Sequence, residues 1–424
     1  LTPPLTAGFF FLEKKYEFLD KLFIVLIAIT FIIPGFKSMD QKVPEMIYLS
    51  SIQVLISVFI LFTKNLNYLT IIKNKSVLSF LLFLSFSFFS LFIAGNKQES
   101  IIELGYFFTI FVTLFNSIIL FRKKNIEFYC LLITFLIFIE SFKVIFEFWK
   151  RFDYQNPLIR SQYYAGFSAN VNVTGFSILF KLPILFYTYL QFKGEKPLFK
   201  ILIAITIFMS FFAITLTYSR GALLVLFLII ILFTLFNFRR IKSSIIIIFI
   251  FILSYGVNKI LLVNVNSDIF NRATTIDLVD SFSSANYRLG YYSDAIKAIK
   301  QKPILGWGIG NWKIVGNLFT IDKREEYEVG YHVHNDFLHI AAETGIFGFS
   351  FYFLFLFYPA FYILKNLFDN NFNFNEIYIY IFLTFFIFFV DSNLNFPRAR
   401  PTSIVNICLL IASTCSLINT KKNE

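Results

Sequence analysis

The chain has 424 residues, of which 57% are hydrophobic and only 15% are charged, and its mean hydropathy is +0.70. This composition excludes a soluble globular domain of this length. In a soluble protein the net charge of +12 would suggest binding to nucleic acid. In a chain this hydrophobic, the distribution of the charges along the sequence has to be considered first. The apolar residues form runs of about 18 to 22, long enough to cross a hydrocarbon core of roughly 30 Å as helices. We therefore predict an all-α polytopic membrane protein.

In chain order, the apolar runs predict about twelve transmembrane helices. This divides the chain into a membrane domain of nine spans (1–263), a large loop (264–336), and a last segment with three spans and a tail (337–424). The predicted spans lie near residues 18–36, 46–63, 77–94, 101–121, 128–149, 173–192, 198–218, 221–238, 243–263, 337–364, 376–393 and 403–419.

Basic residues are distributed unequally between the two sides of these spans. The connections on the N-terminal side hold 18 Lys and Arg residues, whereas the short loops on the other side hold 9. Because positive charge is retained in the cytoplasm, both termini are expected to be cytoplasmic and the large loop to lie outside. The net charge therefore reflects membrane topology and requires no nucleic acid.

The large loop before the tenth span, about 70 residues from 264 to 334, is too long to be a passive connection. Within it, Asn286–Gln301 is predicted to form an amphipathic helix with Ser283 or Ser284 as its N-cap. Pro303 would end this helix, and the segment GWGIGNW follows it. One face of the helix would be formed by Tyr287, Tyr291, Ala295 and Ala298.

All three histidines of the chain, His332, His334 and His339, fall where the large loop meets the tenth span. Because imidazole titrates near neutral pH, this cluster suggests proton transfer or metal binding. One alternative is that His332 and His339 are polar residues at the start of a helix. Another is a zinc site, in which the histidines would be joined by Asp336 or Glu343.

Arginines stand out at three places in the predicted topology. Arg220 lies in a tight turn between two apolar spans, where it must reach water, a partner or a ligand. Arg288 opens the predicted amphipathic helix. Snorkelling to the interface for Arg220 and a solvated helix charge for Arg288 are the alternatives. Arg398 and Arg400 follow Asp391, and local pairing of Asp391 with one of them is expected.

These residue types suit one kind of chemistry. Guanidinium groups bind phosphate oxygens through paired donors, so two of them could hold a pyrophosphate whose lipid tail stays in the bilayer. A sugar on pyrophosphate already has a good leaving group, and the reaction then needs a base for the incoming hydroxyl, which a neutral imidazole supplies. No nucleotide site is expected, because a P-loop motif is absent and GWGIGNW lacks the strand–helix context of a dinucleotide site.

Several of these segments resemble one family. His334-Asn335, followed after nine residues by Gly345 and after two more by Gly348, resembles the HN-x9-G-x2-G signature of the O-antigen ligase and polymerase superfamily. YSRGA around Arg220 resembles that family's arginine-bearing turn, NYRLGYYSDAIKAIKQKPILGWGIGNW its periplasmic-loop segment, and GFSANVNVTGFSILFKLP the segment before them. Asn335 would help to set the start of the following helix, and the two glycines of the signature would allow close helix packing.

The resemblance implies a GT-C-like glycosyltransferase of lipopolysaccharide biosynthesis in the bacterial inner membrane, with its active site on the periplasmic face. It implies metal-independent, inverting transfer of a glycan from undecaprenyl pyrophosphate to a lipid A-core hydroxyl, without a cofactor and surrounded by membrane lipids. His334 would be the general base, and Arg220 and Arg288 would hold the pyrophosphate. The expected supporting residues are His332, Asn335, Arg160 and Asn172.

Within the superfamily, an O-antigen polymerase and an O-linked protein oligosaccharyltransferase are alternatives to a ligase. Without an additional C-terminal soluble domain, the chain fits a ligase better. A transporter or lipid flippase belongs to a different class, in which Arg220, Lys181 and the charges of the fifth span would form a polar pathway. Those charges, Glu140, Lys143 and Glu147, share a helix face and could instead neutralise one another. The sequence encodes neither the sugars nor the oligomeric state.

Overall fold

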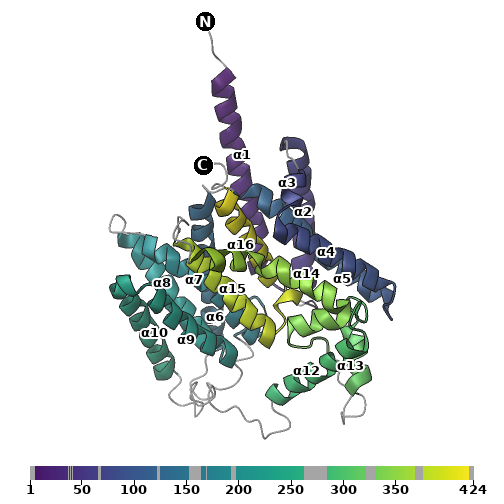
Figure 1. Ribbon diagram of the computed structural model, residues 1–424. Helices are drawn as coiled ribbons and strands as arrows, with labels where there is room; N and C mark the ends of the chain where they lie inside the picture. Colours follow the sequence, from purple (N-terminus) through teal and green to yellow (C-terminus); the bar gives the residue numbers. More distant parts are fainter. Residues whose placement is uncertain are drawn as a thin grey trace.

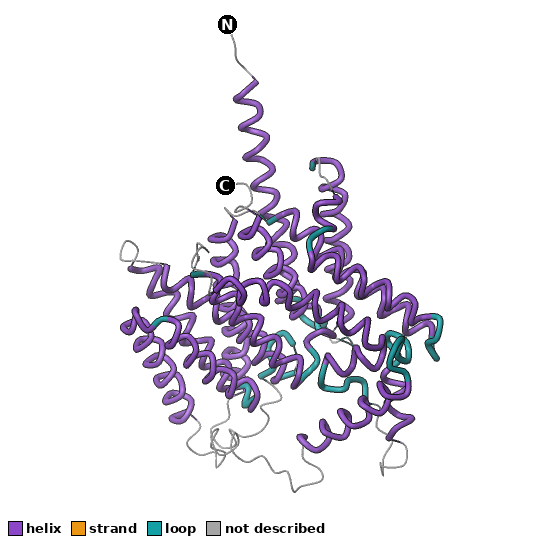
Figure 2. The backbone as a smooth tube through the Cα atoms, viewed as in Figure 1, coloured by secondary structure: helices purple, strands orange, loops and turns teal. Residues whose placement is uncertain are grey.

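The structure, a computed structural model, describes residues 5–36, 38, 40, 42–64, 68–121, 125–151, 164–168, 170–191, 197–261, 284–320, 330–367 and 376–419. Helices are the only regular secondary structure in this part of the chain (Figure 2). The predicted all-α class is therefore confirmed for it. Arg160 and Ser283, both singled out in the sequence, lie outside the described residues.

Each predicted span coincides with a helix of the described chain, and shorter elements connect the long helices (Figure 1). The long helices are α1 (Leu5–Ala28), α2 (Lys42–Thr63), α4 (Lys75–Leu91), α5 (Lys97–Leu120), α6 (Ile126–Arg151), α7 (Val171–Gln191), α8 (Pro197–Leu216), α9 (Arg220–Phe236), α10 (Ile241–Leu261), α14 (Asp336–Leu367), α15 (Ile377–Leu394) and α16 (Pro401–Asn419). The shorter elements are η1 (Ile29–Ile32), α3 (Tyr68–Ile72), η4 (Phe238–Arg240), α12 (Ser284–Gln301), α13 (Trp312–Thr320) and η5 (Pro397–Ala399).

Nine of the described helices are long and apolar enough to cross a membrane, by length and composition. Helices α4 and α9 are apolar but have only 17 residues each. Helix α1, whose sequence carries six charged residues between Glu13 and Lys21, is not among the nine. The chain is thus a multi-pass membrane protein, and the number of twelve spans stays a prediction.

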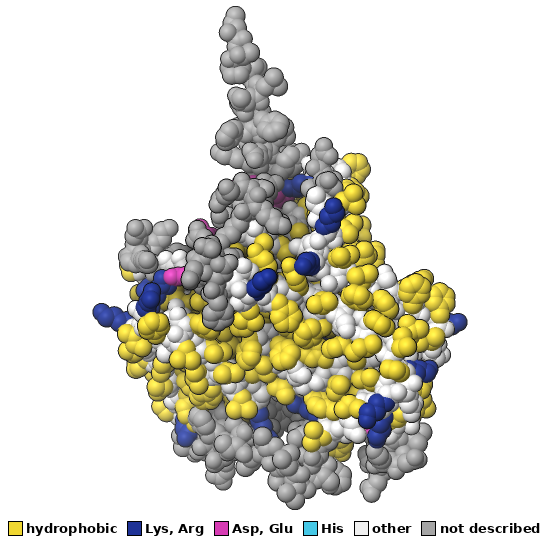
Figure 3. Space-filling model, in the orientation of Figure 1, with side chains coloured by type: hydrophobic (Ala, Val, Ile, Leu, Met, Phe, Trp, Pro, Cys, Tyr) yellow, Lys and Arg dark blue, Asp and Glu magenta, His cyan; other side chains and the backbone are white. Residues whose placement is uncertain are grey.

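The two ends of the helical chain lie on the same side of the bundle. Figure 1 places the start of α1 and the end of α16 opposite α12 and α13. Apolar side chains form a band around the face drawn in Figure 3, and Lys and Arg lie mostly along its upper and lower margins. This arrangement agrees with the predicted topology, while the assignment of the two sides to cytoplasm and periplasm still rests on the charge distribution.

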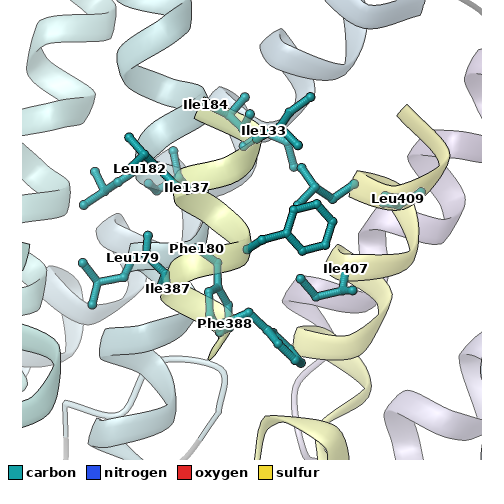
Figure 4. Packing of buried hydrophobic residues seen from close by; sticks show 14 of the residues in the cluster. Ile133, Ile137, Leu179, Phe180, Leu182, Ile184, Ile387, Phe388, Ile407 and Leu409 are labelled. Atoms are coloured by element: carbon teal, nitrogen blue, oxygen red, sulfur yellow. The ribbon is translucent and has the colours of Figure 1, made fainter. Parts of the chain in front are cut away.

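The centre of the bundle is formed by α7 and α16. In their apolar windows 94% and 89% of the residues are buried, against 22% in α2 and 28% in α10, which face outward. Side chains from α6, α7, α15 and α16 meet in this core (Figure 4). Phe180 and Phe388 pack with ring centroids 5.6 Å apart, and both are at most 1% exposed. The two central helices are less apolar than the outward-facing ones, with mean hydropathies of 1.4 for α7 and 1.8 for α16 against 2.1 for α2 and for α10, because their polar side chains find partners inside the bundle.

The charges inside the spans are paired with one another. Lys181 on α7 donates to both carboxylate oxygens of Glu140 on α6, at 2.9 and 3.0 Å, and Ser177 joins them. Lys143 pairs with Glu147 one turn along α6, at 3.1 Å. The charges of α6 are therefore neutralised, which was one of the two alternatives in the sequence analysis. Lys143 and Glu147 neutralise each other, whereas Glu140 pairs with Lys181 on another helix.

The large loop is fixed to the membrane helices by a break in α14. Gly345 has φ +71° and ψ −174°, so the helix is interrupted there. The carbonyl groups of Ala342 and Glu343 instead accept from the amides of Trp307 and Gly308, at 3.0 and 2.9 Å. A Cβ atom at Gly345 would overlap the carbonyl of Ile304. The glycine thus admits the loop backbone beside α14, which differs from the helix packing that the sequence predicts.

The same loop segment reaches across to the connection between α4 and α5. Asn311 Nδ2 donates to Ser100 Oγ at 2.8 Å, and Asn311 Oδ1 accepts from the amide of Asn96 at 2.8 Å. The amide of Ile309 donates to Ser90 Oγ at 3.0 Å. The GWGIGNW segment therefore docks the loop onto helices more than 200 positions away in the sequence.

The predicted amphipathic helix is confirmed as α12. Tyr291, Ala295 and Ala298 are buried in a small second core with Trp312 of α13. Tyr287, which was expected on the same face, is 43% exposed, so that part of the prediction is wrong. It lies in the first turn of α12, ahead of this second core.

Candidate functional site

His334 occupies an unusual backbone position. Its φ is +59°, and it is one of three non-glycine residues with positive φ in the described chain. Such a conformation is sparsely populated and is retained where the surroundings impose it. The next residue, Asn335, begins α14, because its Oδ1 accepts from the amides of Phe337 and Leu338 at 3.0 Å each. The expectation that Asn335 sets the helix start is thus met by its geometry.

Three helices meet at His334. The Tyr292 hydroxyl of α12 donates to the carbonyl oxygens of His334 (2.9 Å) and of Asn393 (2.7 Å) at the end of α15. Asn335 Nδ2 donates to Asn393 Oδ1 at 3.2 Å. The ring of Tyr291 stacks on that of His334, with centroids 6.1 Å apart. Sequence reasoning missed the role of Tyr292, although it lies four residues after Arg288.

Arg288 lies one turn before Tyr292 on α12, and its charge acts on His334. Burial, followed by the charge of Arg288 and the electrostatic influence of His339, lowers the pKa of His334 from 6.5 to about 4. Burial also lowers the pKa of Arg288, which faces the charge of Asp391. At neutral pH His334 is therefore an uncharged imidazole in the electrostatic field of the Arg288 guanidinium.

Arg220 is the first residue of α9, directly after Ser219, whose Oγ caps the helix through the amide of Ala222. A Cβ atom at Gly221 would lie 3.3 Å from Leu394, so the start of α9 packs against the end of α15. Leu394 follows Asn393, which contacts Tyr292. The structure thus brings Arg220 to the same end of α15 as Arg288 and His334.

Asn172 lies in the first turn of α7, where its amide donates to Asn170 Oδ1 at 3.0 Å. The next turn packs tightly on the start of α9, because a Cβ atom at Gly175 would lie 2.9 Å from Ala222 and 3.6 Å from Ser219. Asn172 is therefore near the Arg220 turn and has no described contact with His334. For Arg160, which lies outside the described residues, only the sequence expectation exists.

His332 and His334 contact the same aromatic ring, that of Phe396, in different ways. His332 stacks on Phe396 with centroids 4.2 Å apart and planes at 14°, whereas His334 meets the same ring nearly edge-on at 5.2 Å. Burial lowers the pKa of His332 well below 6.5, followed by the charges of His339, Arg398 and Arg400. The two histidines thus face different cations: Arg288 acts on one, Arg398 and Arg400 on the other.

A buried cluster centred on Arg398 was not predicted. Arg398 lies 2.9 Å from Glu103, 3.7 Å from Asp336 and 3.9 Å from Glu343, and its amide donates to Asp336 at 2.8 Å. Burial opposes its charge, but Glu343, Glu103 and Asp336 outweigh burial and raise the pKa of Arg398. The expected pairing with Asp391 is wrong, because Asp391 accepts from Asn395 at 2.6 Å while Arg398 turns towards α5 and α14.

His339 belongs to this cluster. Its Nδ1 accepts from the amide of Val333 at 3.4 Å, which leaves the proton on Nε2 for donation to Glu343 at 3.2 Å. Glu343 also accepts from the amide of Trp312 at 2.9 Å. His339 is 3% exposed and helps to order the loop. Across the described residues, no three His, Cys, Asp or Glu side chains are placed to share a metal ion.

Residues 205–353 match the family model described as O-antigen ligase. The matched region contains Arg220, Arg288 and His334 but neither Asn172 nor Arg398. No curated protein matches the chain.

Proposed function

The chain carries an O-antigen ligase family domain at residues 205–353, and from this premise we propose that it is an O-antigen ligase. It transfers a glycan polymer from undecaprenyl pyrophosphate to a hydroxyl of lipid A-core, at the periplasmic face of the bacterial inner membrane. The observation that carries the proposal is that α12, α14 and α15 meet at His334, with Arg288 one turn before Tyr292, whose hydroxyl contacts His334. His334, Arg288 and Tyr292 all lie inside the matched region.

His334 acts as the general base. The acceptor oxygen attacks the anomeric carbon, the bond from that carbon to the pyrophosphate oxygen breaks with inversion, and the hydroxyl proton passes to the imidazole. A pKa of about 4 keeps the imidazole unprotonated at neutral pH, although it also makes it a weak base before the donor binds. When pyrophosphate neutralises Arg288, the pKa of His334 rises, so the base becomes stronger once the donor is present.

Arg220 and Arg288 hold the two phosphates. Their placement at the same end of α15 supports this role, because two guanidinium groups can bind phosphate oxygens in pairs and stabilise the charge that develops on the leaving group. Asn335 supports the base by capping α14, and His332 supports it through the shared Phe396 ring. Asn172, near the Arg220 turn, and Arg160 are supporting residues that line the donor site.

A gene deletion tests the assignment. A ligase predicts that cells without this protein lose long glycan from lipid A-core and retain it on undecaprenyl pyrophosphate. Complementation with the wild-type gene restores the glycan, whereas His334→Ala expressed at the same level does not. Accumulation of single repeat units on the carrier would instead identify a polymerase and refute the ligase. Transfer of the glycan to a protein acceptor would instead identify an O-linked protein oligosaccharyltransferase.

A second arm concerns transport. If the His334→Ala variant stops glycan transfer while donor lipid still reaches the outer leaflet, the protein acts on the glycan and does not move the lipid. Loss of the donor lipid from the outer leaflet would contradict the proposal. Full activity after exhaustive chelation is expected, because the two arginines supply the positive charge at the leaving group.

A further inference from the structure

A cavity of about 580 Å3 lies next to the stacked rings of His332 and Phe396. It lies between the starts of α2 and α5, the α13 region and η5, and Tyr331, His332, Phe396 and Arg400 are among its lining residues. Its volume falls in the range of about 300–1,000 Å3 that is usual for small-ligand sites. Arg220, Arg288 and His334 do not line it, so it is separate from the proposed pyrophosphate site.

The charged groups of the cavity balance. Among its described lining residues, four are acidic and four are basic. Three of the basic residues are bound to carboxylates: Lys42 to Glu103 at 3.1 Å, Lys313 to Glu99 at 2.6 Å, and Arg398 to Glu103 at 2.9 Å. A lining without net charge does not favour a polyanion, and it offers both donors and acceptors.

Arg400 differs from the other cations. Its guanidinium lies 5.2 Å from the centre of the Phe396 ring, and no carboxylate or carbonyl oxygen of the described residues lies within hydrogen-bonding distance of it. Burial lowers the pKa of Arg400, and the charges of Glu45 and Asp40 act in the opposite direction without contact. A half-buried guanidinium without acceptors beside an aromatic ring can bind several hydroxyl groups.

Unpaired acceptors lie in the same region. Glu343 Oε2, which lies 3.9 Å from Arg398, and Glu45 Oε2, in a residue whose charge acts on Arg400, are buried and have no hydrogen-bond partner among the described residues. Buried polar atoms are normally paired, so such atoms require water or a ligand. A ligand that brings both donors and acceptors, and that has an apolar face for the aromatic lining residues Tyr331 and Phe396, fits this lining.

The position of the cavity relative to His334 agrees with an inverting reaction. Phe396 lines the cavity, and its ring is 5.2 Å from the His334 ring. The charge of Arg288 acts on His334, while Arg400 acts on His332 on the cavity side. In inversion the incoming hydroxyl attacks the anomeric carbon on the face opposite the leaving pyrophosphate, so donor and acceptor need separate places near the base.

We propose that this cavity binds the terminal saccharide of the acceptor, an uncharged, hydroxyl-rich sugar, and that Arg400 is its specificity-determining residue. The inference rests on the proposed function, which supplies the acceptor. Arg400 donates to the sugar hydroxyls. Because His332 already covers a face of Phe396, the exposed Tyr331 ring of the lining packs against the sugar.

The test measures binding separately from transfer. Full-length protein in lipid nanodiscs is titrated with a core oligosaccharide that ends in an uncharged hexose, using a calorimetric or fluorescence readout. Because a hydrogen bond to a charged group is worth about 1.5–3 kcal/mol, Arg400→Gln is expected to weaken binding by about 10- to 100-fold. In transfer assays the same variant raises the acceptor KM and leaves the donor KM unchanged.

Arg239→Gln is the matched control, since the Arg239 guanidinium also lies over a neighbouring ring, 5.7 Å from the centre of Phe238. Arg239 belongs to η4, which follows the end of α9 that is opposite to Arg220. The Arg239→Gln variant should change neither binding nor transfer. His334→Ala should abolish transfer and keep oligosaccharide binding. A core oligosaccharide that ends in a uronic acid tests the substrate class. If this anionic probe binds more tightly than the uncharged one, by about tenfold or more, the proposal that the cavity binds an uncharged sugar is refuted.

The two proposals fail separately. Oligosaccharide binding that depends on Arg400, without any glycan transfer by the wild-type protein, would refute the proposed ligase and keep the saccharide site. Glycan transfer by the wild-type protein with equal binding by the Arg400→Gln variant would refute the saccharide site and keep the ligase.

Discussion

The Arg398 cluster makes a quantitative prediction about stability. Arg398 is 2% exposed and faces the carboxylates of Glu103, Asp336 and Glu343, which are themselves shielded from water. Arg398→Met preserves the length of the side chain but leaves these carboxylates with less compensation. Lys42 still pairs with Glu103, so the main loss falls on Asp336 and Glu343. Removing one partner of a buried pair costs about 3–5 kcal/mol, and this is the decrease expected in the free energy of unfolding.

The pair of Lys313 with Glu99 provides the control. Its distance of 2.6 Å is shorter than any of Arg398, but the two side chains are 31% and 29% exposed. Water screens such a pair, so Lys313→Met is expected to cost at most about 1 kcal/mol. Both variants are measured by reversible unfolding of detergent-solubilised protein with dodecyl sulfate, followed by tryptophan fluorescence. Equal costs for the two variants would refute the argument that burial, and not distance, determines the strength of these pairs.

Three further predictions concern the site and the loop. The chain has only three histidines, so NMR of 13C-labelled histidine can follow the titration of His334 directly. The pKa of His334 should be about 4, and kcat/KM should fall as the pH drops through that value. Arg288→Gln should raise the pKa of His334. A pKa that does not respond to Arg288→Gln would show that the two groups are not coupled. Tyr292→Phe removes the hydroxyl that donates to the carbonyl oxygen of His334, and it should lower the free energy of unfolding by about 0.5–1.5 kcal/mol. The variant should also lower kcat by a larger factor than it changes the donor KM. An unchanged kcat would exclude a positioning role for Tyr292. Gly345→Ala should destabilise the fold by several kcal/mol, because the added Cβ atom would overlap the backbone of Ile304. Gly105→Ala is the control and should be neutral or stabilising, because no atom lies within 4 Å of the added Cβ. Similar melting temperatures for the two variants would contradict the break in α14.

Much of the architecture could be predicted because it follows from local composition. Runs of apolar residues predict helices that satisfy their own backbone groups in lipid, and each run is a helix in the described chain. Amphipathic spacing predicted α12, and the Asn at 335 predicted the start of α14. The interruption at Gly345 was not predicted, since the carbonyl groups freed there are bonded by a loop some 35 residues earlier.

The sequence by itself determined the membrane class, the alternation of charge along the chain, and the choice of His334, Arg220 and Arg288 as candidates. The tertiary structure alone decided their surroundings. Arg398 pairs with Glu103 across 295 positions, and the same fold gives His332 and His334, two residues apart, different charged neighbours. The physical reason is that helix packing selects the neighbours of a buried charge, and a desolvated charge interacts strongly with whatever packing places beside it.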